Sequence, residues 1–140
     1  MKANIVTAGK TYDLSQRFYF EAAHTLRREI EAESSRRIHG HTYEAEVTVR
    51  GQPDPTTGMV IDLALLREHI RAVRNLLDHQ FLDDVEGLGP PTLENLCAFI
   101  LERLGHEVKG LAVVSVWRQA SGDRCTVAVV PGWGAHPEKP

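Results

Sequence analysis

The sequence predicts an α+β fold in which an antiparallel four-stranded sheet carries two helices on one face. Alternating apolar and polar residues mark strands towards both ends of the chain, and apolar residues at helical spacing fill its middle. The order strand, strand, helix, helix, strand, strand favours hairpin pairing, with both helices packed on one face. With 140 residues and no linker or repeat, we expect one domain over residues 1–140 and a core over about 12–130.

Two N-terminal strands are predicted over residues 12–24 and 39–50, because successive residues of a strand point to opposite faces. On the first strand, one face carries Phe18, Phe20, Ala22 and His24. On the second strand, one face carries His39, His41, Tyr43, Ala45, Val47 and Val49. The polar residues 26–38 between them are expected to form a loop, and residues 53–58, rich in proline and threonine, a turn.

Two helices are predicted in the middle of the chain. Apolar residues recur at helical spacing over 63–77 and over 93–104, and Asp62 and Thr92 are placed to cap the first turns. Residues 78–91, rich in Asp, Gly and Pro, are expected to be a loop. Residues 111–118 and 125–130 are predicted to pair as a hairpin, and the tail 132–140 is expected to fray.

Composition and charge narrow the class of protein. A net charge of -3 and a pI near 6.1 argue against a nucleic-acid partner, which usually requires a basic face. No apolar run is long enough to span a membrane and residues 1–10 lack an apolar signal core, so we expect no membrane association and a cytoplasmic protein. Cys97 and Cys125 have no Cys-x-x-Cys partner, which predicts buried thiols rather than a disulfide or metal clip.

The sequence His39-Gly40-His41 is the strongest chemical signal. Residues two apart on a strand share a face, so both imidazoles can reach one ion, and Gly40 would let another chain segment approach closely. Antiparallel pairing would bring His24 beside them. Three neutral imidazoles and one open position are typical of catalytic zinc, whereas structural zinc more often uses cysteines. The alternative is a set of hydrogen-bonded core histidines, which the third histidine makes less favourable.

A second signal is the pair Asp78-His79, directly after the first predicted helix. An aspartate beside a histidine can orient the ring and stabilise its protonated form, as a proton shuttle requires. The alternative is that these are two ordinary polar residues at a helix end, since neighbours in sequence need not touch.

Five separated motifs resemble the 6-pyruvoyl-tetrahydropterin synthases and the bacterial 6-carboxy-tetrahydropterin synthases of queuosine synthesis. In chain order they are FEAAH at 20–24, IHGH at 38–41, DPTTGMVID at 54–62, LDHQFLDD at 77–84 and PTLENL at 91–96. They occur in the family's order, and the resemblance runs over about residues 12–130. The EAAH and DPTTG motifs are more similar to the bacterial branch.

The resemblance implies the tunnelling fold, in which identical chains assemble into a hexamer-like ring or barrel with active sites between chains. Open sheet edges also favour such self-assembly. The resemblance further implies that Asp78 and His79 form a proton relay, and that Thr92 and Glu94 contact a small-molecule substrate. It implies that a Zn²⁺ cofactor is held by His24, His39 and His41.

Two positions depart from the family pattern. Ser35 stands where the family has a catalytic cysteine, and a serine hydroxyl is far less acidic than a thiol, so Glu33 in the same loop is an alternative base. Arg118 stands where the family has a glutamate that grips the donor edge of the pterin ring. Arginine has donors only and suits a carboxylate or phosphate. Alternatively, Arg118 faces outward and pairs with a surface acid.

The sequence therefore predicts a zinc-dependent lyase of the 6-carboxy-tetrahydropterin synthase type, acting on dihydroneopterin triphosphate or a related anionic small molecule. One alternative is a 6-pyruvoyl-tetrahydropterin synthase-like paralogue retuned to a non-pterin substrate, which Ser35 and Arg118 favour. The other is a non-catalytic, zinc-containing binding module, against which the intact histidines and Asp78 argue.

Overall fold

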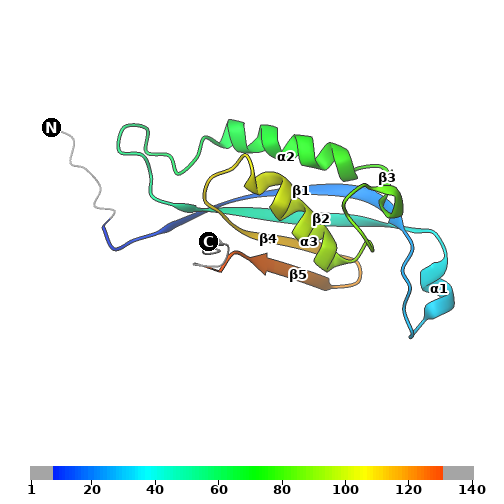
Figure 1. Ribbon diagram of the computed structural model, residues 1–140. Coiled ribbons are helices and arrows are strands. Elements are labelled where there is room, and N and C mark those ends of the chain that lie inside the picture. Colours follow the sequence, from blue (N-terminus) through cyan, green and yellow to red (C-terminus); the bar gives the residue numbers. More distant parts are fainter. Residues whose placement is uncertain (1–7, 131–140) are drawn as a thin grey trace, which may run out of the picture.

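Strands β1 (Tyr12–His24) and β2 (His39–Gly51) form the long hairpin at the centre of the sheet (Figure 1). The computed structural model describes residues 8–130, so the tail predicted to fray lies outside the described residues. Pairing of β1 with β2 is antiparallel over the whole length of both strands, from Tyr12 opposite Gly51 to His24 opposite His39. Both predicted strands are thereby confirmed.

The sheet has five strands in the order β3-β1-β2-β4-β5 and is mixed, so the expectation of a four-stranded antiparallel sheet is corrected. The additional strand β3 (Gln80–Phe81) pairs parallel with β1. It forms because His79 adopts a left-handed backbone conformation, φ 57°, and donates its backbone N–H to the Glu21 carbonyl at 2.6 Å. The predicted loop 78–91 therefore begins with a strand and with the 3-10 turn η1 (Leu82–Asp84).

The predicted loop 26–38 contains a short helix, α1 (Ala32–Arg36), which the sequence analysis missed. One turn of polar residues has no apolar periodicity to reveal it. The C-terminal hairpin pairs β4 (Leu111–Arg118) with β5 (Asp123–Ala128). Strand β5 begins two residues earlier than predicted, because Arg118 and Asp123 still pair across the turn.

Helices α2 (Leu63–Leu77) and α3 (Leu93–Gly105) lie on the same face of the sheet, as predicted (Figure 1). Both predicted caps are present, since the side chain of Asp62 accepts from Ala64 N and that of Thr92 accepts from Asn95 N. Helix α2 packs on β1, and α3 packs on β4 and β5. The core between helices and sheet is completely buried at Phe20, Ala45, Val47, Leu66, Leu96, Ile100, Val114 and Val116.

The opposite face of the sheet is polar, and no helix of residues 8–130 packs on it. Trp117 lies on it between two guanidinium groups, those of Arg17 and Arg124, whose carbons are 5.6 and 4.3 Å from the ring centroid. The next residue, Arg118, therefore points to the helix-covered face, because neighbouring strand residues alternate. Within residues 8–130, no helix is long and apolar enough to cross a bilayer, and both cysteines are free thiols.

Candidate metal centre and active site

Three histidines meet where the central hairpin opens. His24 ends β1 and lies directly opposite His39, the first residue of β2, while His41 lies opposite Ala22 on the same face. The predicted close approach at Gly40 is not found among the described residues, because an added Cβ there would meet only the Ala22 carbonyl, at 3.7 Å. The strand register alone brings the three rings together.

The ring nitrogens converge on one point. The Nε2 atom of His24 lies 2.9 Å from Nε2 of His39 and 3.0 Å from Nε2 of His41. The plane of the His24 ring makes an angle of 70° with the His39 ring and 87° with the His41 ring. The three residues offer ligand atoms that all lie within 4.8 Å of one another, a spacing at which they could hold a metal ion.

Hydrogen bonds on the far side of the rings fix which nitrogen carries the proton. Nδ1 of His24 lies 3.0 Å from the carbonyl oxygen of Pro91, and Nδ1 of His39 lies 2.7 Å from that of Arg37. A carbonyl only accepts, so each Nδ1 donates and each Nε2 of the neutral ring keeps a lone pair. Lone pairs pointing at one another repel unless a cation lies between them. The donor set therefore fits a metal ion.

Burial keeps the imidazoles of His24 and His41 unprotonated. Desolvation lowers the pKa of His24, which is 1% exposed. Desolvation, followed by the charges of His24 and Arg118, lowers the pKa of His41 to about 4. A metal requires the neutral imidazole, and protonation would compete with it. At neutral pH both rings are in the state that a metal requires.

Arg118 lies beside this cluster, so the alternative of an outward-facing arginine is wrong, although the side chain does pair with an acid. Its Nη1 is 3.3 Å from Nε2 of His41, and its Nη2 donates to Oδ2 of Asp123 at 2.7 Å. Hydrogen bonds from Ser121 and the charge of Arg118 lower the pKa of Asp123. The guanidinium is thereby fixed at the edge of the histidine cluster.

A cavity of about 400 Å³ opens next to His24 and Arg118. Thr92 and Glu94, the two predicted substrate contacts, line it from the first turn of α3. The Thr92 hydroxyl accepts a hydrogen bond from Asn95 N and so caps α3 in the ligand-free chain. The cavity brings both residues to the metal cluster, and it is large enough for a small ligand.

The two candidate bases of the first loop do not contact the histidines in the described structure. Ser35 is 3% exposed, and its hydroxyl donates to the Ala32 carbonyl at 3.1 Å within α1. The Glu33 side chain is 91% exposed and interacts only weakly with Arg37, at 3.5 Å. Neither group lies against the metal cluster within one chain.

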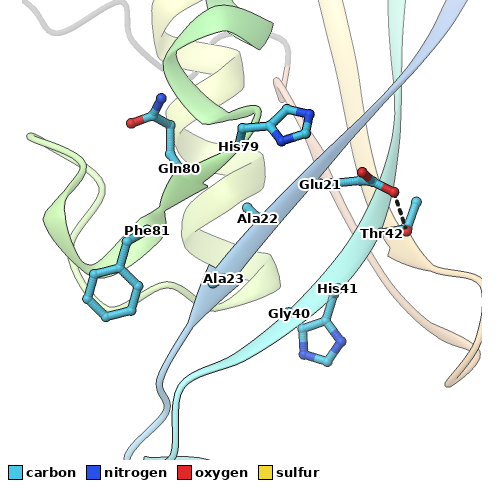
Figure 2. A pocket seen from close by; sticks show the side chains of 9 residues that line it. All are labelled: Glu21, Ala22, Ala23, Gly40, His41, Thr42, His79, Gln80 and Phe81. Carbon is cyan, nitrogen blue, oxygen red and sulfur yellow. Dashed lines mark hydrogen bonds between the residues drawn. The ribbon is translucent and has the colours of Figure 1, made fainter.

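Asp78 and His79 are neighbours, but they lie on the outer side of β1. Asp78 accepts from Glu21 N at 3.0 Å and pairs with Arg74 at 3.2 Å. The exposed His79 ring approaches its carboxylate to 3.7 Å, which is longer than a hydrogen bond. His79 and His41 both line an open concavity of about 540 Å³, and Figure 2 shows their rings apart, His79 on the turn after α2 and His41 on β2.

Two parts of the centre were missed by the sequence analysis. The Pro91 carbonyl orients His24, and a backbone oxygen leaves no mark on a residue pattern. The Tyr43 hydroxyl lies 3.3 Å from the same Nδ1 and is almost completely buried. Its position on the histidine-bearing face of β2 was a usable signal.

A sequence profile described as 6-pyruvoyl tetrahydropterin synthase matches residues 13–128, which include every residue of the centre. The chain belongs to this family. The matched residues span the central hairpin, the two long helices and the C-terminal hairpin of this chain.

Individual relatives agree with this assignment. The 6-carboxy-5,6,7,8-tetrahydropterin synthase of Synechocystis is 40% identical over 105 residues, which cover 71% of this chain and 80% of that protein. The Caenorhabditis elegans 6-pyruvoyl tetrahydropterin synthase structure superposes with a TM-score of 0.73 and 26% identity, over 86% of this chain and 96% of that one. The fold is also that of a Plasmodium vivax 6-pyruvoyltetrahydropterin synthase, which was solved with a catalytic glutamate replaced by cysteine. That structure superposes with a TM-score of 0.66 and 19% identity, over 84% of this chain and 97% of that one.

Proposed function

We propose that this chain is a zinc-dependent lyase of the 6-carboxy-tetrahydropterin synthase type, acting on dihydroneopterin triphosphate or a related anionic pterin. The observation that carries the proposal is the convergence of three Nε2 atoms, two of them held with their lone pairs inward by backbone carbonyls. Membership of the family supports the pterin class, and the Synechocystis relative supports the 6-carboxy type. A place in queuosine synthesis rests on the motif resemblance described above.

His24, His39 and His41 would hold the ion. The chemistry that bound zinc supplies is polarisation of a substrate hydroxyl or carbonyl, which acidifies the adjacent C–H bond. His79, next to Asp78, would carry a proton away from or back to the substrate carbon. Thr92 and Glu94 would position the substrate in the cavity next to His24.

The base is assigned to the first loop. Glu33 is the stronger candidate, because a carboxylate can accept a proton at neutral pH and a serine hydroxyl cannot do so without a neighbouring base. The catalytic glutamate of the Plasmodium vivax enzyme is a precedent for this choice. Ser35 is held inside α1 by its hydrogen bond to Ala32, which further weakens its candidacy.

We also propose that residues 1–140 act as one domain within a ring of identical chains. Glu33 and His79 both lie apart from the cluster within one chain, and both are exposed. A neighbouring copy could bring such groups to a metal centre that its partner provides. The outer edge of β5 is unpaired among the described residues and offers a site for strand pairing. A monomer by light scattering at micromolar concentration would contradict the ring.

The decisive experiment combines metal analysis with turnover. We expect about one zinc per chain in the wild type, none in His39→Ala, and undiminished zinc in the matched control His79→Ala. With dihydroneopterin triphosphate, wild-type protein should form product, whereas both variants should not. Glu33→Gln should lose turnover if it is the base, and Ser35→Ala should then retain it. Zinc retained by His39→Ala would refute the metal centre.

A second candidate function is favoured by Arg118. Where the pterin-binding glutamate is expected, the guanidinium lies 3.3 Å from a metal-ligand nitrogen and offers donors only. A paralogue retuned to a non-pterin anion would hold zinc normally and fail to turn over the pterin. A non-catalytic binding module would bind zinc and ligand without product from any substrate. The same assay separates the pterin lyase from these two alternatives.

A further inference from the structure

Arg118 has too few partners for a side chain that is 16% exposed. Among the described residues its Nε is buried with no hydrogen-bond partner. Its Nη1 faces only Nε2 of His41, and a metal on that nitrogen would take away the lone pair that Nη1 now contacts. Only Nη2 keeps a strong acceptor, the Asp123 carboxylate. Occupation of the metal centre would therefore leave most of this guanidinium unsatisfied.

The charges at this point do not balance either. A metal dication and a guanidinium would share one imidazole, and one more arginine, Arg28, lines the adjoining cavity, where it pairs with Glu31 at 3.0 Å. Two acidic residues line the same cavity, Glu94 and Asp123, and both are exposed. Asp123 accepts a hydrogen bond only from Nη2 of Arg118. Like charges held close together in a partly buried site repel strongly. An anion next to Nη1 would relieve this repulsion.

The cavity supplies room for such an anion. Its volume of about 400 Å³ adjoins both His24 and Arg118, so one ligand can reach the metal and the guanidinium together. Oxygen atoms of carboxylates and phosphates accept charge-assisted hydrogen bonds from arginine and also coordinate zinc. A neutral group that only donates hydrogen bonds could neither accept from Arg118 nor coordinate the metal.

We propose that Arg118 makes this cavity an oxyanion site, which holds a carboxylate or phosphate of the substrate against the metal. The inference rests on the proposed metal centre and narrows its substrate class. The preferred substrate carries an oxyanion within a bond or two of the oxygen that the metal binds. Arg118 is then a specificity-determining residue, with a charge opposite to that of the family's glutamate.

Isothermal titration calorimetry on the zinc-loaded protein tests this with two probes, inorganic phosphate and glycolate. We expect Arg118→Gln to weaken binding of at least one probe about tenfold or more, as loss of a charge-assisted hydrogen bond predicts. The matched control Arg124→Gln removes an exposed arginine whose guanidinium lies on Trp117, on the opposite face of the sheet, and should change affinity little. Asp123→Asn should strengthen binding, because it removes the anion that competes for Arg118.

The two probes distinguish a phosphate from a carboxylate as the substrate's oxyanion. The probe whose affinity falls more in Arg118→Gln identifies the group that Arg118 binds. Equal affinities of wild type and Arg118→Gln for both probes would overturn the inference. Zinc content is measured on the same samples. A wild type without zinc would overturn the metal centre itself, whereas full zinc content with binding that ignores Arg118 would overturn only the oxyanion site.

Discussion

Replacing Arg118 by methionine should stabilise the metal-free fold while removing anion binding. Methionine keeps an unbranched apolar stem of similar reach and has no polar hydrogen to leave unpaired. The change eliminates the buried Nε, which has no partner among residues 8–130. It also ends the contact with His41 and the ion pair with Asp123.

The magnitude follows from these contacts. An unsatisfied buried donor costs about 1–3 kcal/mol, and the lost hydrogen bond to His41 contributes about 1 kcal/mol. The pair with Asp123, whose side chain is half exposed, contributes little in water. The net gain in unfolding free energy is then between zero and about 2 kcal/mol. Zinc affinity should rise by about tenfold or more, because a repelling cation has gone.

Urea unfolding of the metal-free proteins measures the first effect, and competition with a zinc chelator measures the second. The size-matched control is Arg67→Met on the exposed face of α2, where a loss of hydrogen bonding to Gln16 should change stability only slightly. If Arg118→Met had a lower unfolding free energy than the wild type, or bound zinc more weakly, the argument from unsatisfied donors would be wrong.

Three further predictions concern other parts of the molecule. In the metal-free protein, the unfolding free energy should rise with pH between about 4 and 6.5, because the unfolded state protonates His41 near 6.5 and the folded state only near 4. Urea unfolding at several pH values should show that the unfolding free energy of His41→Gln rises less steeply with pH. Gly110→Ala should lower the melting temperature by several degrees, since φ is +80° and the new Cβ would lie 2.7 Å from the Arg50 carbonyl; an unchanged melting temperature would contradict this. Cys97, completely buried and with its pKa raised to about 12 by desolvation, should resist alkylation in the native state, and mass spectrometry should find Cys125 modified first.

Most of the fold was predictable because its signals are local. Alternation over residues 12–24 and 39–50 fixed both central strands, and two cap residues, Asp62 and Thr92, fixed where the long helices begin. Strand β3 was not predictable in this way. Its two residues depend on the left-handed turn at His79 and on the carbonyl of Glu21, which is distant in sequence.

The candidate site also has parts that local sequence patterns predict and parts that they do not. The meeting of His24 with His39 and His41 follows from alternation and one antiparallel register. The inward direction of Arg118 follows from the same rule on β4, applied one residue after Trp117. The carbonyls that orient the imidazoles could not be found, because every residue has one. The roles of Glu33 and His79 stay predictions, since neither side chain contacts the histidine cluster among the described residues.

The pairing of His24 with His39 also governs how the hairpin opens. These two residues are the last register pair of β1 and β2, and residues 25–38, with α1, leave the sheet between them. An ion held by both side chains would close this loop much as a crosslink does, and would suppress its local opening. The loop displays four exposed arginines at positions 27, 28, 36 and 37. If the centre holds an ion, a chain without it would therefore present trypsin-like proteases with a segment that opens and is cleaved more readily.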